Sequence, residues 1–103
     1  MNTQEVLNLL QTSGISFAYH HWNGKRAAPY GVLLSPYANN MAADGKVYFS
    51  VNRWRAELYC KQKEPEWEKK LEAVLTGAEV FFTKSETYIE QIEMFQINYE
   101  FEV

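Results

Sequence analysis

The stretch Lys46–Lys61, KVYFSVNRWRAELYCK, is the segment around which the rest of the chain is organised. Aromatic and aliphatic residues alternate in it with single polar residues, and it contains neither Pro nor Gly, which is typical of one long β-strand. The alternation changes phase midway. Val47, Phe49 and Val51 share one parity, whereas Trp54, Ala56, Leu58 and Cys60 share the other.

A period of two cannot change parity without an extra residue, so we expect a β-bulge or a sharp bend near Ser50–Arg53. Fully extended at about 3.3 Å per residue, the strand would run roughly 46 Å. A domain of this size has a radius of gyration of only about 13 Å. The strand must therefore bend around the core, or one of its ends must leave the body as an arm.

Length and composition predict one folded domain over residues 1–103, with an aromatic fraction of 16% and a net charge of −3. No apolar run approaches the length of a membrane span, and the N-terminus lacks the pattern of a signal peptide. Cys60 is the only cysteine, which excludes an internal disulfide and indicates synthesis in a cytoplasm. The acidic balance disfavours a protein that binds nucleic acid through phosphate contacts.

Two helices are predicted. The first covers Thr3–Thr12, where Asn2 and Glu5 have the spacing of a capping box. The second covers Lys63–Thr76, with Pro65 at a first-turn position where its missing N–H is not needed. Each carries a one-sided apolar stripe, which indicates packing against a sheet or another helix.

Ile15–Trp22 and Pro29–Leu34 read as two strands, and Asn23-Gly24 between them is a turn signal that predicts a hairpin. The following segment, Ser35–Gly45, contains Pro, two Asn, Asp and Gly with almost no periodicity and is predicted to be a loop. Its length makes it a candidate binding loop or arm tip.

Near the end of the chain, Glu79–Thr83 is predicted to be a short strand and Phe95–Val103 a strictly alternating one. The segment Lys84–Met94 fits either an extension of both strands into a hairpin or a loop. The order α-β-β-β-α-β-β predicts an α+β fold in which two helices cover one face of an antiparallel sheet of four to five strands.

The chain offers little catalytic chemistry. His20 and His21 are adjacent, so in a strand they would point to opposite faces and could not ligate one metal without a kink. Cys60 has the inward parity of a small buried residue. Arg53 and Arg55 lie among aromatic residues, but the acidic composition opposes a nucleic-acid-binding face. We therefore expect no enzyme, no cofactor and no metal.

Several segments resemble small tail proteins encoded by phages and prophages of low-GC Gram-positive bacteria. The family's long strand, charged helix start and alternating final strand correspond to Lys46–Tyr48, Glu57–Tyr59, Glu64–Glu72, Lys84–Glu90 and Phe95–Val103. The stretch YGVLLSPYANNMAADGK resembles the family's variable strand-and-loop region. Such proteins are similar to the tail-completion, or tail-terminator, family of long-tailed phages.

This resemblance implies an α+β subunit that forms a ring at the head-proximal end of the tail tube, where it completes the tail or joins it to the head. The implied partners are further copies of the chain, the tail tube protein and the head connector, within a virion made in a bacterial cytoplasm. The family has no catalytic residues. Its ring contacts, made by loops and strand arms, correspond here to Tyr37, Asn39, Asn40, Met41, Asp44, Lys46, Arg53 and Arg55.

Two other hypotheses stay open from the residues alone. One is a small immunity-type or inhibitor-type module whose acidic surface covers a basic partner in a one-to-one complex. The other is a small enzyme that uses His20 or His21, which would require a pocket with perturbed titratable groups.

Overall fold

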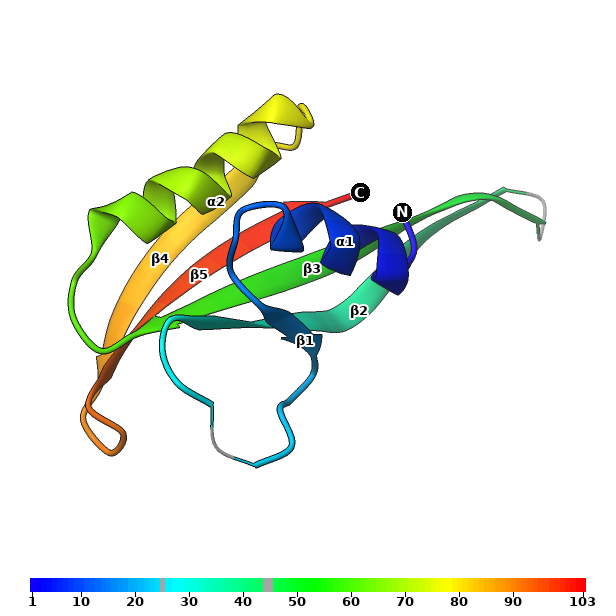
Figure 1. Ribbon diagram of the computed structural model, residues 1–103. Helices are drawn as coiled ribbons and strands as arrows, with labels where there is room; N and C mark the ends of the chain where they lie inside the picture. The colour runs from blue at the N-terminus through cyan, green and yellow to red at the C-terminus, as the bar shows by residue number, and fades with distance from the viewer. Residues whose placement is uncertain (25, 44–45) are drawn as a thin grey trace.

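Five strands and two helices make up the protein, as a computed structural model shows for residues 1–24, 26–43 and 46–103 (Figure 1). In chain order they are α1 (Thr3–Gln11), β1 (Phe17–Tyr19), β2 (Tyr30–Ala43), β3 (Lys46–Cys60), α2 (Pro65–Gly77), β4 (Phe82–Ile89) and β5 (Met94–Glu102). The α+β class and the element order predicted from the sequence are confirmed.

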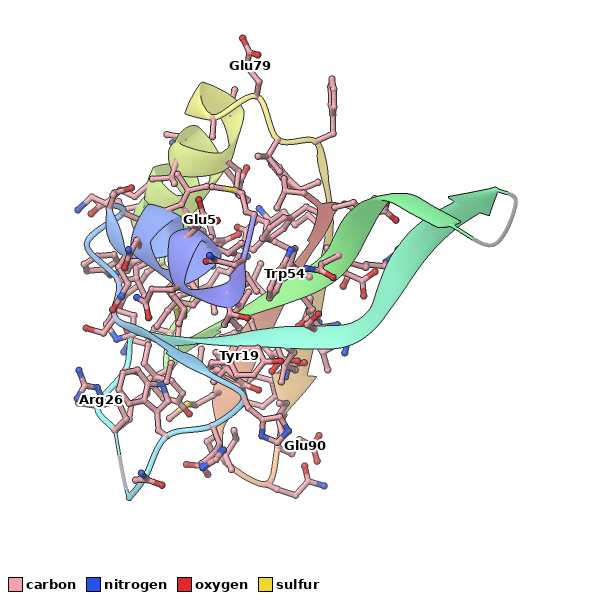
Figure 2. All side chains as sticks on the ribbon, turned by 90° about the vertical axis from the view of Figure 1, so that its right-hand side faces the viewer. Glu5, Tyr19, Arg26, Trp54, Glu79 and Glu90 are labelled. Atoms are coloured by element: carbon pink, nitrogen blue, oxygen red, sulfur yellow. The ribbon has the colours of Figure 1, made fainter. Side chains whose placement is uncertain are left out.

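The five strands form one sheet with the spatial order β1-β2-β3-β5-β4. Both helices lie on the same side of it, α1 toward β1 and α2 toward β4 (Figures 1 and 2). The core lies between these two layers. Its largest fully buried side chains are Trp54, Tyr99, Leu10, Ile15, Leu33, Leu58, Leu71, Leu75, Ile97 and Val6. The other face of the sheet is left without helices, and we call it the uncovered face.

The sheet is mixed rather than purely antiparallel, and the predicted hairpin between the first two strands is wrong. β1 runs parallel to β2, with Phe17 opposite Gly31 and Tyr19 opposite Leu33. After Tyr19 the chain turns out of the strand at His20, which has a φ of 71°. The segment between the strands then returns to the starting end of β1 before β2 begins, so the two strands point the same way.

Most of the predicted Ser35–Gly45 loop is strand. β2 continues to Ala43 and pairs with β3 as far as Ala43 opposite Lys46. β3 pairs with β5 only from Arg53 to Cys60, so the outer parts of β2 and β3 form a two-stranded ribbon. The five-stranded part of the sheet and the two helices form what we call the body. The ribbon, residues 38–43 and 46–52, projects from the body and bends toward the uncovered face (Figure 2). We call it the arm.

The bend at the base of the arm lies next to Arg53, at the end of the segment Ser50–Arg53 where a bulge or a sharp bend is predicted, but the extra residue is in β2. The pairing of β2 with β3 shifts between Leu34 and Tyr37, where two residues of β2 face one residue of β3. One of the two is Pro36, which has no N–H to donate to a ladder and therefore suits a bulge. A second shift, between Met41 and Ala42, lies farther out along the arm.

The helix predictions hold with small changes at the ends. The capping box of α1 is present: Asn2 Oδ1 accepts from the Glu5 backbone N–H at 2.8 Å, and Glu5 Oε1 accepts from the Asn2 N–H at 2.9 Å. α2 begins at Pro65, two residues later than predicted. Of the two alternatives for residues 84–94, the hairpin is correct, because β4 and β5 pair from Phe82–Phe101 to Ile89–Met94.

Candidate interaction surfaces

The arm carries four of the eight contact residues predicted from the sequence. In its ladder Asn39 lies opposite Val51, Asn40 opposite Ser50 and Met41 opposite Phe49. Tyr37 lies opposite Arg53 at the base, and Lys46 opposite Ala43 at the outer end. The structure thus places Asn39, Asn40, Met41 and Lys46 on one projecting element, with Tyr37 at its base. Their side chains and the whole of Asp44 lie outside the described part of the protein.

Arg53 and Arg55 lie at the base of the arm and form ion pairs on the uncovered face. Arg55 binds Glu100 at 2.9 Å, and Arg53 reaches the other oxygen of the same carboxylate at 3.2 Å. Arg53 also pairs with Glu102 at 3.5 Å, and Arg55 approaches Glu57 at 3.9 Å. Hydrogen bonds from Arg55 and Arg53 lower the pKa of Glu100. The two guanidinium groups thus hold neighbouring strands β3 and β5 together.

A hydrogen-bonded row continues the polar network away from the arm. Gln96 Nε2 donates to the Tyr59 hydroxyl at 2.7 Å, and that hydroxyl donates to Glu57 Oε1 at 2.9 Å. Burial raises the pKa of Tyr59 to about 12, and Glu57 contributes in the same direction. The phenol therefore remains protonated and serves as a fixed donor at neutral pH.

A hollow of about 760 Å³ lies at the end of the uncovered face away from the arm. Its aromatic and apolar lining includes Trp22, Tyr30, Tyr59, Ile92 and Met94, and we call it the aromatic hollow. Tyr30 and Tyr59 stack with ring centroids 5.0 Å apart. Trp22 is held by its indole N–H, which donates to the Gly31 carbonyl at 3.0 Å, and by the Arg26 guanidinium 4.3 Å from its ring centroid.

His20 and His21 lie at the edge of this hollow, and their side chains come together instead of pointing to opposite faces. The Nδ1 atoms are 3.2 Å apart, because the positive φ of His20 breaks the strand alternation there. Across the described residues, no group of three or more His, Cys, Asp or Glu is placed to hold a metal ion. Cys60 is 2% exposed, as its parity predicted, and burial raises the pKa of its thiol to about 11.

At the opposite end of the body, Phe81 is 94% exposed. It lies between α2 and β4, next to Val80, which is buried, and Phe82, whose ring packs edge-on against Tyr99 with centroids 5.4 Å apart. Phe81 borders two shallow hollows of about 350 and 560 Å³. Glu79, Glu100 and Glu102 line the first of these together with Arg53.

Sequence reasoning missed both the aromatic hollow and the exposed position of Phe81. Trp22 stands at the end of the predicted Ile15–Trp22 strand, but β1 ends at Tyr19. The position of Trp22 therefore depends on how the chain between β1 and β2 folds back. The sequence does indicate that one of the adjacent residues Phe81 and Phe82 is exposed, because two neighbouring residues at the start of a strand cannot both face the core. It does not reveal which of the two is exposed.

Comparison with known proteins gives a likeness of fold. No family model matches this chain. No curated protein matches it either. Among solved structures, a chain of the virion of the native gene transfer agent (GTA) particle superposes with a TM-score of 0.63 at 14% sequence identity. The match covers 90% of this chain and 81% of the other. This protein has the fold of a virion chain.

The likeness extends over nearly the whole α+β arrangement. At 14% sequence identity it is a likeness of fold. Among the described helices, none is long and apolar enough to cross a membrane.

Proposed function

We propose that this protein is a structural component of a phage virion, located in the tail or neck, where it completes the tail or joins it to the head. The observation that carries the proposal is the fold shared with a chain of the gene transfer agent virion over 90% of this chain. The resemblance of segments such as Lys46–Tyr48 and Lys84–Glu90 to phage tail proteins points the same way. In this role the protein forms a ring at the head-proximal end of the tail tube and has no enzymatic activity.

The arm is the element that we assign to contacts with neighbouring subunits, the tail tube protein or the head connector. In the ladders of the described strands, Lys46 to Val51 of β3 pair with β2 alone. A two-stranded ribbon offers unpaired backbone groups along its outer edges, to which another chain can add a strand. Asn39, Asn40, Met41 and Lys46 lie along this ribbon, whereas Arg53 and Arg55 anchor its base.

A binding assay with tail tubes tests this proposal. Purified protein is mixed with tail tubes, and separately with DNA-filled heads, from the phage or induced prophage that encodes it, and the pellets are examined by gel and electron microscopy. We expect saturable binding at one end of the tube. A variant in which Asn-Gly replaces residues 39–51 should lose this binding, because it lacks the arm beyond the Ala38–Asn52 pair.

The matched control is Glu90→Gln, which changes an exposed residue at the far end of the β4–β5 hairpin. It should bind as the unmodified protein does. A protein that stays in the supernatant with both tubes and heads would contradict the virion assignment. A tight one-to-one complex with a basic protein would instead favour the immunity or inhibitor hypothesis.

A further inference from the structure

Phe81 has the properties of an anchor for another protein surface. Its neighbours in the chain, Val80 and Phe82, pack into the core, so the backbone at this point is held in place while the Phe81 ring remains in water. Single exposed apolar residues are common and need no explanation by themselves. An aromatic ring that is 94% exposed and rigidly mounted is nevertheless the kind of side chain that dominates binding energy at interfaces.

The aromatic hollow is a matching receptor on the same chain. Its volume of about 760 Å³ is ample for one phenyl ring, and Trp22, Tyr30 and Tyr59 belong to its lining. Aromatic pairs prefer tilted or offset arrangements, which such a lining can provide. The Trp22 hydrogen bond and the Tyr30–Tyr59 stack hold these walls in place before anything binds.

The charges around the two features have opposite signs. Three glutamates, Glu79, Glu100 and Glu102, lie at the Phe81 end, where Arg53 and Arg55 both pair with Glu100. The charged groups that line the aromatic hollow are the cationic Arg26 and Lys61 and the acidic Glu57. Glu79 and Arg26 lie at opposite ends of the body (Figure 2). A copy of the chain therefore cannot fill its own hollow, but it presents an acidic aromatic end to the basic hollow of another copy.

We propose that Phe81 of one copy inserts into the aromatic hollow of the next copy. This inference rests on the proposed function, since it names the contact that would link the ring. Joining two different surfaces head to tail produces a closed ring when the rotation between copies closes. The opposite charges orient the two ends and make the association weaken as salt is added.

Site-specific photocrosslinking tests this contact. The photoreactive residue p-benzoylphenylalanine is placed at position 81, and the protein is irradiated both in concentrated solution and within assembled particles. Mixing isotopically heavy and light copies distinguishes crosslinks between copies from those within one copy. We expect crosslinks between copies that map to the hollow, at Trp22, Tyr30, Tyr59 or Met94. The same probe at Gln4, exposed on α1, should not reach these residues.

Sedimentation of Phe81→Ala gives a second measurement. We expect the concentration needed for self-association to rise about tenfold or more, since removing an interface anchor typically has at least this effect. Gly77→Ala, at a site with open space beside it at the end of α2, is the control and should leave self-association unchanged.

The outcomes separate this contact from the proposed virion role. Particles that contain the protein but crosslink from position 81 only to the tube protein, to the connector or to another part of a neighbouring copy would overturn the contact and leave the virion role standing. Absence of any crosslink between copies in both samples would overturn it as well. Particles that lack the protein altogether would overturn the proposed function, whereas head-to-tail crosslinks in solution would still support the contact.

Discussion

At the scale of single residues, Gly31 shows how closely β1 and β2 approach. A Cβ atom at this position would lie well inside the distance at which two carbon atoms touch, against three ring atoms of Phe17. Phe17 is 4% exposed and Gly31 donates its backbone N–H to the Ser16 carbonyl at 2.8 Å, so neither side can easily move away. The missing side chain is thus what allows the Phe17 ring to cover β2.

We predict that Gly31→Ala lowers the free energy of unfolding by about 1–3 kcal/mol, because the added methyl group overpacks a filled core. Urea denaturation followed by tryptophan fluorescence measures this. The control is Gly77→Ala, where a Cβ meets nothing within 4 Å and a helical position favours alanine. Equal stabilities for the two variants would show that the Phe17 ring yields without cost.

At the scale of elements, Glu68 joins α2 to β4. It is 4% exposed, and its carboxylate lies 2.8 Å from the ammonium groups of both Lys63 and Lys84. Burial by itself would raise the pKa of Glu68, but the hydrogen bonds and charges of Lys63 and Lys84 outweigh it and lower the pKa. Lys63 also pairs with Glu86 on β4, and Lys84 pairs with Glu72 on α2 at 2.8 Å.

The lowered pKa predicts acid sensitivity. A carboxyl group whose pKa is lower in the folded state stabilises the fold above its ordinary pKa, and this contribution disappears as the pH falls through the folded value. We expect Glu68→Gln to lower the free energy of unfolding by roughly 1.5–3 kcal/mol near neutral pH, the range for hydrogen bonds to charged groups. Between about pH 7 and about pH 3, the difference from the unmodified protein should shrink.

Denaturation curves across this pH range check the prediction. Glu90→Gln, at an exposed position in the β4–β5 turn, serves as the control and should change stability little at any pH. A Glu68→Gln difference that is the same at both ends of the range would show that the ion pairs do not carry the effect.

In the whole molecule, the body and the arm are stabilised by different interactions. The molecule extends 50 × 28 × 22 Å, and the arm projects beyond the layered part (Figure 1). Strands in the body lie in a five-stranded sheet under two helices. A two-stranded ribbon without a third strand or a helix is marginal by itself, so it gains little stability from its own pairing and gives little to the body.

We therefore predict that replacing residues 39–51 by Asn-Gly changes the free energy of unfolding by less than about 0.5 kcal/mol, the usual range for surface changes. The replacement keeps the Asn52 carbonyl that accepts from the Val103 N–H at 3.2 Å. Thermal and urea denaturation measure the change. A loss of several kcal/mol would mean that the arm packs into the fold as well as extending from it.

Elements whose signals are local could be predicted from the amino-acid sequence. The Asn2–Glu5 capping box placed the start of α1, and the parity of Trp54 to Cys60 identified the buried side of β3. Strict alternation from Phe95 likewise identified β5. In each case the element can be predicted from its own residues, because helix capping and strand alternation involve only a few neighbouring positions.

The pairing of the strands, their directions and the surfaces that result depend on long-range contacts and could not be predicted from the sequence. β1 is parallel to β2 because of the path between them, and the Asn-rich stretch after Ser35 is a strand because β3 provides its ladder. Arg53 and Arg55 were predicted as contact residues, but the ion pairs with Glu100 depend on β5 lying beside β3. The aromatic hollow and the exposure of Phe81 likewise depend on contacts between residues far apart in the chain, which local sequence patterns do not predict.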